Sequence, residues 1–200
     1  MNSILSYLVQ MAFPALLGAL VWLIWRPWRK KRLAAHGLIS GPFREGALLL
    51  FFMFLAGLLA LTLTPAGFWS SILRGERPHL PPAFQGGVNL VPVRESMALL
   101  RYYVRHGLWD AVWINFPGNI AMFLPIGFFA GLLADKPRWW KGVLSAFALS
   151  FFIEFFQLFV SRGTDIDDLI LNTLGGLIGH WLFLLLRRGA PDFVKRCSKL

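Results

Sequence analysis

Polar and charged side chains gather in one short stretch of an otherwise apolar chain, between Phe151 and Gly179. Four of the ten acidic residues of the chain lie between Glu154 and Asp168. A carboxylate in a membrane-spanning helix is costly and marks a functional site by default. Glu154 is therefore the candidate for acid or base chemistry, with Arg162 as the group that orients it. The predicted ligand-binding residues are Asn115, Asn119, Glu154, Gln157, Arg162, Asp165, Asp168 and Asn172.

Other kinds of catalytic or metal site find little support in the spacing of the residues. The single cysteine, Cys197, lies in a basic tail away from the acidic stretch, and Ser161 has no histidine at a spacing that suggests a serine triad. The run from Asp165 to Asp168 could bind a hard cation, but it lacks the twelve-residue ligand pattern of an EF-hand loop. We therefore predict no metal and no cofactor, and we assign no complete catalytic constellation.

The same residues also have purely structural explanations. Asp167 or Asp168 is well placed to cap the helix that follows and to interact with its positive end. Arg162 can pair with a buried carboxylate, which needs a partner. Asn119 and Asn172 can hydrogen-bond between helices. The choice between a ligand site and a packed polar junction stays open at this point.

The composition indicates the elements that must position these groups. Of 200 residues, 56% are hydrophobic and only 15% are charged, against about 25% charged in soluble domains. We expect an all-α, polytopic membrane helix bundle with about five transmembrane helices, and residues 1–200 form a single domain. The five apolar segments are Ile4–Trp25, Gly46–Thr64, Pro117–Ala134, Gly142–Val160 and Leu169–Leu186.

The long segment between the second and third apolar runs, Ala66–Phe116, is mixed in character. Within it, Arg94–His106 carries apolar and basic residues in a pattern that predicts a short interfacial helix on the membrane surface.

The basic residues predict how the chain crosses the membrane. Residues 26–45 contain six Lys or Arg, residues 135–141 contain three, and the tail after Leu186 contains five. With five spans these three segments share one side, so we expect a cytoplasmic C-terminus and an outward N-terminus. The net charge of +10 fits anionic lipid headgroups better than nucleic acid, because no basic recognition helix is present.

This topology brings the polar residues of three spans to one depth near the outer surface. Glu154 lies six residues before the end of the fourth span, about 9 Å below its end, and Gln157 shares its face. Asn172 lies about 6 Å below Asp168 on the fifth span. Asn119 lies at the outer start of the third span. We expect these groups to form one cluster.

The order of the motifs resembles that of the VanZ-like family over residues 89–179. The motifs are Asn89-Leu-Val-Pro92, Asn115-x-x-Gly-Asn119 with Phe123-x-Pro125-x-Gly127, Glu154-x-x-Gln157, and Arg162-x-x-Asp165-x-Asp167-Asp168 with Asn172, Gly175 and Gly179. The resemblance implies a small polytopic protein of the bacterial cytoplasmic membrane and a role in the cell envelope. The founding member lowers sensitivity to the lipoglycopeptide teicoplanin.

Three functions fit these observations. The first is recognition of a lipid-linked cell-wall precursor or a lipoglycopeptide at the outward-facing cluster, where Arg162 would contact phosphate or carboxylate. The second is a membrane-embedded enzyme that acts on such a lipid with Glu154 as acid or base. The third is a structural bundle whose polar cluster only holds the helix ends together. The expected partners are membrane lipids and one of these envelope molecules, and not nucleic acid.

Overall fold

Five helices in the described part of the chain are long and apolar enough to cross a membrane, which confirms the predicted all-α bundle. The computed structural model describes the backbone of residues 3–65, 67–160 and 162–197, and the side chains from residue 10 onward. Ala66 and Ser161, at the ends of two predicted segments, lie outside the described residues. Four of the spans are single helices: α1 (Ser3–Ala34), α2 (Pro42–Leu63), α7 (Trp139–Gln157) and α8 (Ile166–Gly189).

The third span begins earlier than its apolar run predicts. It consists of α5 (Trp109–Trp113), a π-helical turn (Ile114–Gly118) and α6 (Asn119–Leu132). The predicted start at Pro117 is therefore wrong. A proline has no N–H to donate inside a helix, and here it lies within the wider π turn, which keeps the span continuous.

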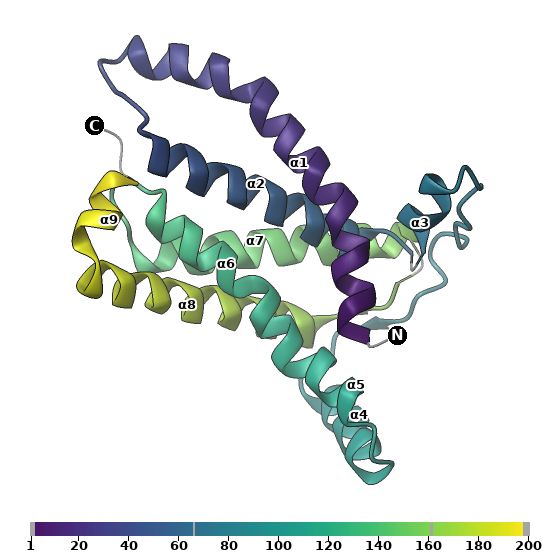
Figure 1. Ribbon diagram of the computed structural model, residues 1–200. Coiled ribbons are helices and arrows are strands. Elements are labelled where there is room, and N and C mark those ends of the chain that lie inside the picture. The colour runs from purple at the N-terminus through teal and green to yellow at the C-terminus, as the bar shows by residue number, and fades with distance from the viewer. Residues whose placement is uncertain (1–2, 66, 161, 198–200) are drawn as a thin grey trace.

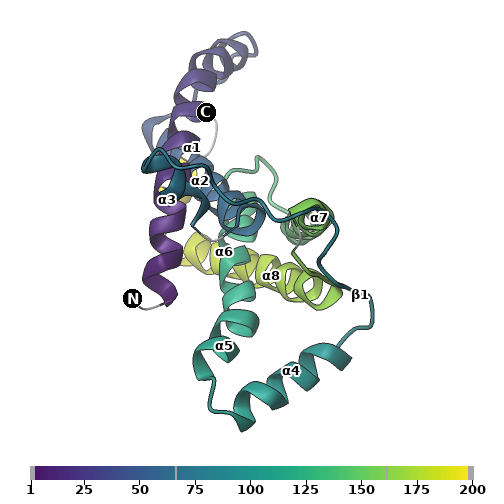
Figure 2. The same cartoon turned by 90° about the vertical axis from the view of Figure 1, so that its right-hand side faces the viewer.

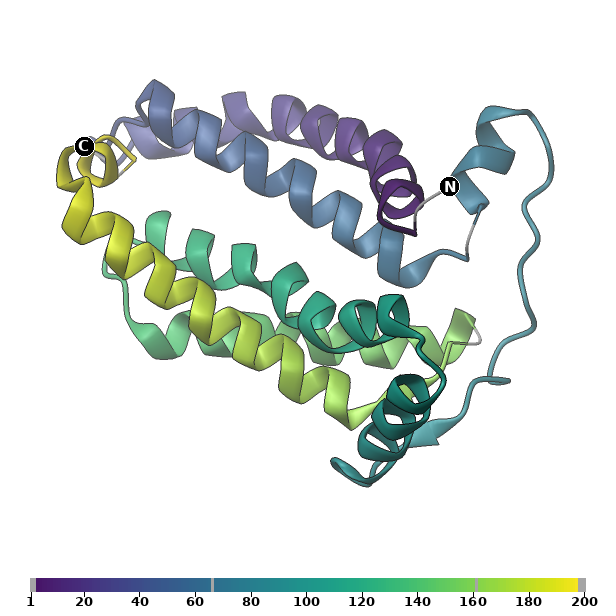
Figure 3. The same cartoon turned by 60° about the horizontal axis from the view of Figure 1, so that its bottom comes forward.

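The spans form two layers, which Figure 3 shows most clearly. One layer is the hairpin of α1 and α2, which pack mainly on each other. The other contains α6, α7 and α8, with α8 packed on both neighbours. Glycines permit the close approach of α6 and α8: a Cβ at Gly127 would overlap the carbonyl of Gly176, and a Cβ at Gly179 would overlap that of Leu124. Small residues serve this purpose where helices meet in membranes.

A core of buried side chains joins the two layers. Leu58 of α2 packs with Phe123 and Ile126 of α6 and with Ala146 and Ile153 of α7. Because these residues are almost fully buried, the α1–α2 hairpin is attached to the bundle through α2.

Of the shorter elements, one helix was predicted from the sequence and the others were not. The helix α4 (Arg94–Arg105) confirms the short helix expected at Arg94–His106, and α3 (Phe68–Leu73) and α9 (Pro191–Arg196) complete the α-helices. A 3-10 turn (Leu158–Val160) follows α7. The chain also forms a parallel pair of two-residue strands, β1 (Val88–Asn89) and β2 (Thr164–Asp165). Such short strands have no periodicity that a sequence pattern reveals.

The bundle has two chemically different ends, which lie on opposite sides in Figure 1, and Figure 2 looks onto the end that holds the strand pair. We call the end with the strand pair and the α7–α8 turn the polar end; α4 and α5 extend from the bundle there. We call the other end the basic end, because it holds the α1–α2 connection, the α6–α7 connection and the end of α8, where the basic residues of the spans gather.

Candidate functional site

Asp165 organises the loop that begins α8. Its extended backbone belongs to β2, and its side chain accepts a hydrogen bond from the backbone N–H of Asp167 at 2.9 Å, so Asp165 is the N-cap. The prediction that Asp167 or Asp168 caps this helix is wrong, because the helix starts at Ile166, before both of them. The same Asp165 carboxylate accepts from the side-chain amide of Asn89 at 2.9 Å, which joins the two strands.

Asp167 fixes the residue that precedes α4. Its two carboxylate oxygens accept from the backbone N–H of Val93 at 2.8 and 3.0 Å. Val93 has a φ of 69°, and the N–H of Arg94 bonds back to the carbonyl of Pro92 at 2.8 Å. A β-branched residue rarely adopts a positive φ, and such strain persists only where surrounding contacts fix it. The buried Asp167 provides those contacts.

Glu154 is also occupied with the backbone. Only 6% of Glu154 is exposed, and its Oε2 accepts from the N–H of Asp165 at 3.0 Å. The hydroxyl of Thr164 donates to the Glu154 carbonyl at 3.1 Å. Glu154 therefore fixes β2 on the end of α7. Its carboxylate binds the backbone of Asp165.

Two amide side chains link the helices below this loop. Asn119 on α6 donates to the carboxylate of Asp168 on α8. Asn172, one turn further along α8, donates to the hydroxyl of Ser150 on α7 at 2.9 Å. The carbonyl oxygen of the buried Asn172 side chain has no hydrogen-bond partner among the described residues. The two amides connect α8 to both of its neighbours.

Arg162 and Gln157 reach in the opposite direction, to the end of α2. The guanidinium of Arg162 donates to the carbonyls of Leu61 and Thr64 at 3.0 and 2.9 Å. Gln157 donates to the carbonyl of Thr62 at 3.2 Å. The last carbonyls of a helix have no partner within the helix, so these side chains complete the C-terminal end of α2.

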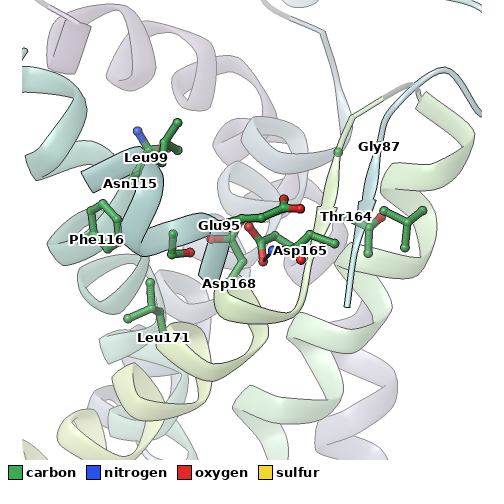
Figure 4. Close-up of a pocket in the computed structure, with 13 residues that line it drawn as sticks. Gly87, Glu95, Leu99, Asn115, Phe116, Thr164, Asp165, Asp168 and Leu171 are labelled. Carbon is green, nitrogen blue, oxygen red and sulfur yellow. Dashed lines mark hydrogen bonds between the residues drawn. The ribbon is translucent and has the colours of Figure 1, made fainter. Parts of the chain in front are cut away.

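A cavity of about 410 Å³ opens beside these contacts, between the strand pair, α4, the π turn and the start of α8. Figure 4 shows residues that line it. Its polar lining consists of Asn89, Glu95, Ser96, Asn115, Thr164, Asp165 and Asp168. Its apolar lining includes Val88, Leu99, Phe116 and Leu171. No Lys or Arg is among the described residues that line it, so the cavity is acidic.

The predicted site residues thus divide into two groups. Asn115, Asp165 and Asp168 line the cavity. Asn119 does not line the cavity but donates to Asp168, which does. The other predicted residues lie outside the lining and hold helices and loops together: Glu154, Gln157, Arg162 and Asn172. Asn115 itself donates to the Ala111 carbonyl at 2.7 Å. The predicted residues do gather at one end of the bundle, where many of their hydrogen bonds are made with backbone groups of α2, α5 and β2.

A comparison with protein families identifies the chain. The family model for VanZ/LLP1 matches residues 49–187, which is more than half of the chain. The chain belongs to the VanZ-like family. The match extends beyond residues 89–179, where the motifs indicated the resemblance, and it begins within α2. Neither the comparison with curated proteins nor that with solved structures found a match.

Several residues at this end of the bundle were not predicted from the sequence. Glu95, Ser96 and Leu99 line the cavity because α4 folds over the strand pair, and only the amphipathic pattern of α4 signals their presence. Ser150 is fully buried and pairs with Asn172, yet a serine within an apolar span carries no signal of its own. Its separation of 22 residues from Asn172 becomes a contact only when α7 and α8 pack.

Proposed function

We propose that this multi-pass VanZ-like membrane protein binds the headgroup of a lipid-linked envelope molecule, or a lipoglycopeptide, in the acidic cavity at its polar end. The observation that supports this function best is the composition of the cavity. Carboxylates of Glu95, Asp165 and Asp168 lie beside the apolar side chains of Leu99 and Phe116. Both ligand classes combine an apolar chain with sugar hydroxyls, and this lining offers contacts for each part.

The negative charge of the cavity indicates which chemical group of the proposed ligand would bind there. Carboxylates accept hydrogen bonds from amines and hydroxyls and repel phosphate. Arg162, which the sequence suggested as a phosphate contact, has two of its nitrogens on carbonyls of α2 and does not line the cavity. The proposed ligand is therefore held through an amine or through sugar hydroxyls, with its phosphate outside the cavity.

The structural alternative also has specific support. The hydrogen bonds of Asn119 with Asp168 and of Asn172 with Ser150 hold three helices together without any ligand. In contrast, Glu154 is buried, bonded to the backbone and outside the cavity lining, so little in the geometry favours an enzyme with Glu154 as acid or base.

Variants of the cavity carboxylates test the proposal. Glu95→Gln and Asp168→Asn keep the size of each side chain, and the latter keeps an oxygen for Asn119. Loss of one charge-assisted hydrogen bond weakens binding by about tenfold or more. We expect less envelope lipid to co-purify with each variant, measured by mass spectrometry, and a smaller effect of the protein on teicoplanin susceptibility.

Asp110→Asn is the matched control, because Asp110 is exposed on α5 and does not line the cavity. It should behave as the wild type does. If the two cavity variants insert normally and leave both lipid retention and susceptibility unchanged, the cavity is not the binding site and the structural alternative is preferred.

A further inference from the structure

A second cavity, of about 450 Å³, lies at the basic end between the end of α1 and the start of α2. Its lining includes three arginines and one histidine, Arg29, Arg32, Arg44 and His36, and no Asp or Glu among the described residues. It is built from residues 25–48, which precede the part of the chain that matches the family. It is therefore separate from the acidic cavity in place, in charge and in sequence.

Two of its arginines are fixed parts of the fold. Arg44 is 5% exposed, and it donates to the carbonyls of Cys197 and Leu133 at 2.9 Å each. Arg29 is also buried and bonds Glu45 and the hydroxyl of Ser40 at 3.1 Å. The Nε atoms of Arg29 and Arg44 are buried without a hydrogen-bond partner among the described residues. The two side chains thus contribute positive charge to the cavity wall, while their Nε atoms are enclosed by the protein.

The positive charge of the cavity is only partly balanced. Glu45 lies outside the lining and is shared between Arg29 and Arg26. In the described part of the chain, no ion pair involves Arg32. The charge of Arg44 is partly offset by Asp135 and Glu45, which interact with it electrostatically. The exposed guanidinium of Arg32 therefore adds positive charge at this cavity, and a bound anion would neutralise it.

The remaining walls are aromatic and aliphatic. The guanidinium of Arg29 lies 5.5 Å from the ring of Trp25, and that of Arg32 lies 5.6 Å from the ring of Trp28. Leu33, Leu38 and Leu48 complete the lining. Tryptophan and arginine occur together where a membrane-spanning helix reaches the headgroup region. Leu20 and Ile24 precede Trp28 on α1 at intervals of four residues, and their side chains are exposed. They provide an apolar surface next to the cavity that an acyl chain could cover.

We propose that this cavity binds the phosphate of an anionic phospholipid, with Arg32, Arg44 and Arg29 around the phosphate and the leucines beside the glycerol and acyl chains. Basic pockets between helices at a membrane surface bind such headgroups. The aliphatic lining favours a lipid over free phosphate, which shares the same charge chemistry. The assignment does not depend on a ligand in the acidic cavity.

Lipid titrations of the purified full-length chain test this site. We expect phosphatidylglycerol in detergent micelles to raise the temperature of unfolding and to appear as a bound species in native mass spectrometry, whereas phosphatidylcholine does neither. Arg32→Gln should weaken phosphatidylglycerol binding about tenfold, the loss of one charge-assisted contact. Arg32 is exposed, so this variant should fold.

Arg188→Gln is the matched control, because Arg188 is an exposed arginine at the basic end that does not line this cavity. It should bind phosphatidylglycerol as the wild type does. An equal loss in both variants would show that general surface charge causes the binding, and would overturn the site. A last control replaces the lipid with inorganic phosphate at equal ionic strength. If phosphate raises the temperature of unfolding as much as phosphatidylglycerol does, the lipid assignment is wrong.

Discussion

At the level of single residues, the carboxylates of the polar end act mainly on backbone N–H groups. Glu154 binds the N–H of Asp165, Asp165 binds that of Asp167, and Asp167 binds that of Val93. This series connects α7, the strand pair and the start of α4. Only Asp165 among these carboxylates also lines the acidic cavity, so the others position the cavity wall rather than contact its contents.

Two substitutions of Glu154 separate positioning from chemistry. Glu154→Ala leaves the Asp165 N–H without its acceptor, which costs about 1 to 3 kcal/mol. Glu154→Gln keeps an oxygen acceptor, so we expect near wild-type stability and lipid retention. Chemical denaturation in detergent, followed by circular dichroism, measures the stability of both variants, and mass spectrometry of the co-purified lipid measures lipid retention. A Glu154→Gln protein that is fully stable but has lost its effect on the envelope would instead support the acid or base role.

At the level of elements, the helices could be predicted and several of their ends could not. The apolar runs place all five spans, since length and hydropathy are properties of a segment alone. The start of α8 depends on the pairing of β2 with β1, and Asn89 and Asp165 are 76 residues apart. The same holds for Arg162: its charge suggested a carboxylate or phosphate partner, but the fold brings it to the end of α2. Contacts of this kind depend on how the helices pack, and they produce no periodic pattern in the sequence.

The close contact between α6 and α8 predicts that replacing Gly179 destabilises the protein. A Cβ at Gly179 would overlap the backbone carbonyl of Leu124, whereas nothing lies within 4 Å of a Cβ at Gly189 on the same helix. Because backbone atoms cannot rotate away, Gly179→Ala should destabilise the protein by about 1 to 3 kcal/mol.

Gly189→Ala is the control and should be neutral or slightly stabilising, since alanine favours helix. Thermal unfolding in detergent compares the two variants. Equal stability of both would show that α6 and α8 do not pack as closely as the structure indicates.

At the level of the whole molecule, the fold collects most of the basic residues at one end and the acidic cavity at the other. Six arginines lie outside the basic end: Arg74, Arg77, Arg94, Arg101, Arg105 and Arg162. The ends of α1 and α8, the start of α2 and the α6–α7 connection share the basic end. This is the arrangement that five crossings require, and the positive-inside rule then predicts that the basic end faces the cytoplasm. The predicted orientation places the acidic cavity on the outer face.

Reporter fusions test that orientation. A phosphatase, active only outside the cytoplasm, should be inactive when fused after the last residue and active when inserted in the exposed Arg74–Glu76 turn. A fluorescent protein that folds only in the cytoplasm should give the reverse pattern. The opposite result for both reporters would invert the topology and place the acidic cavity inside.

The contact of Arg162 with α2 has a consequence for how the protein is made. The two carbonyls that it binds precede it by 101 and 98 residues. At a synthesis rate of 5 to 20 residues per second, α2 waits roughly 5 to 20 s for Arg162 to leave the ribosome. The α1–α2 hairpin must therefore persist alone in the bilayer during that interval. Completion of the bundle then becomes a late step of biogenesis, at which an unassembled hairpin is exposed to quality-control proteases.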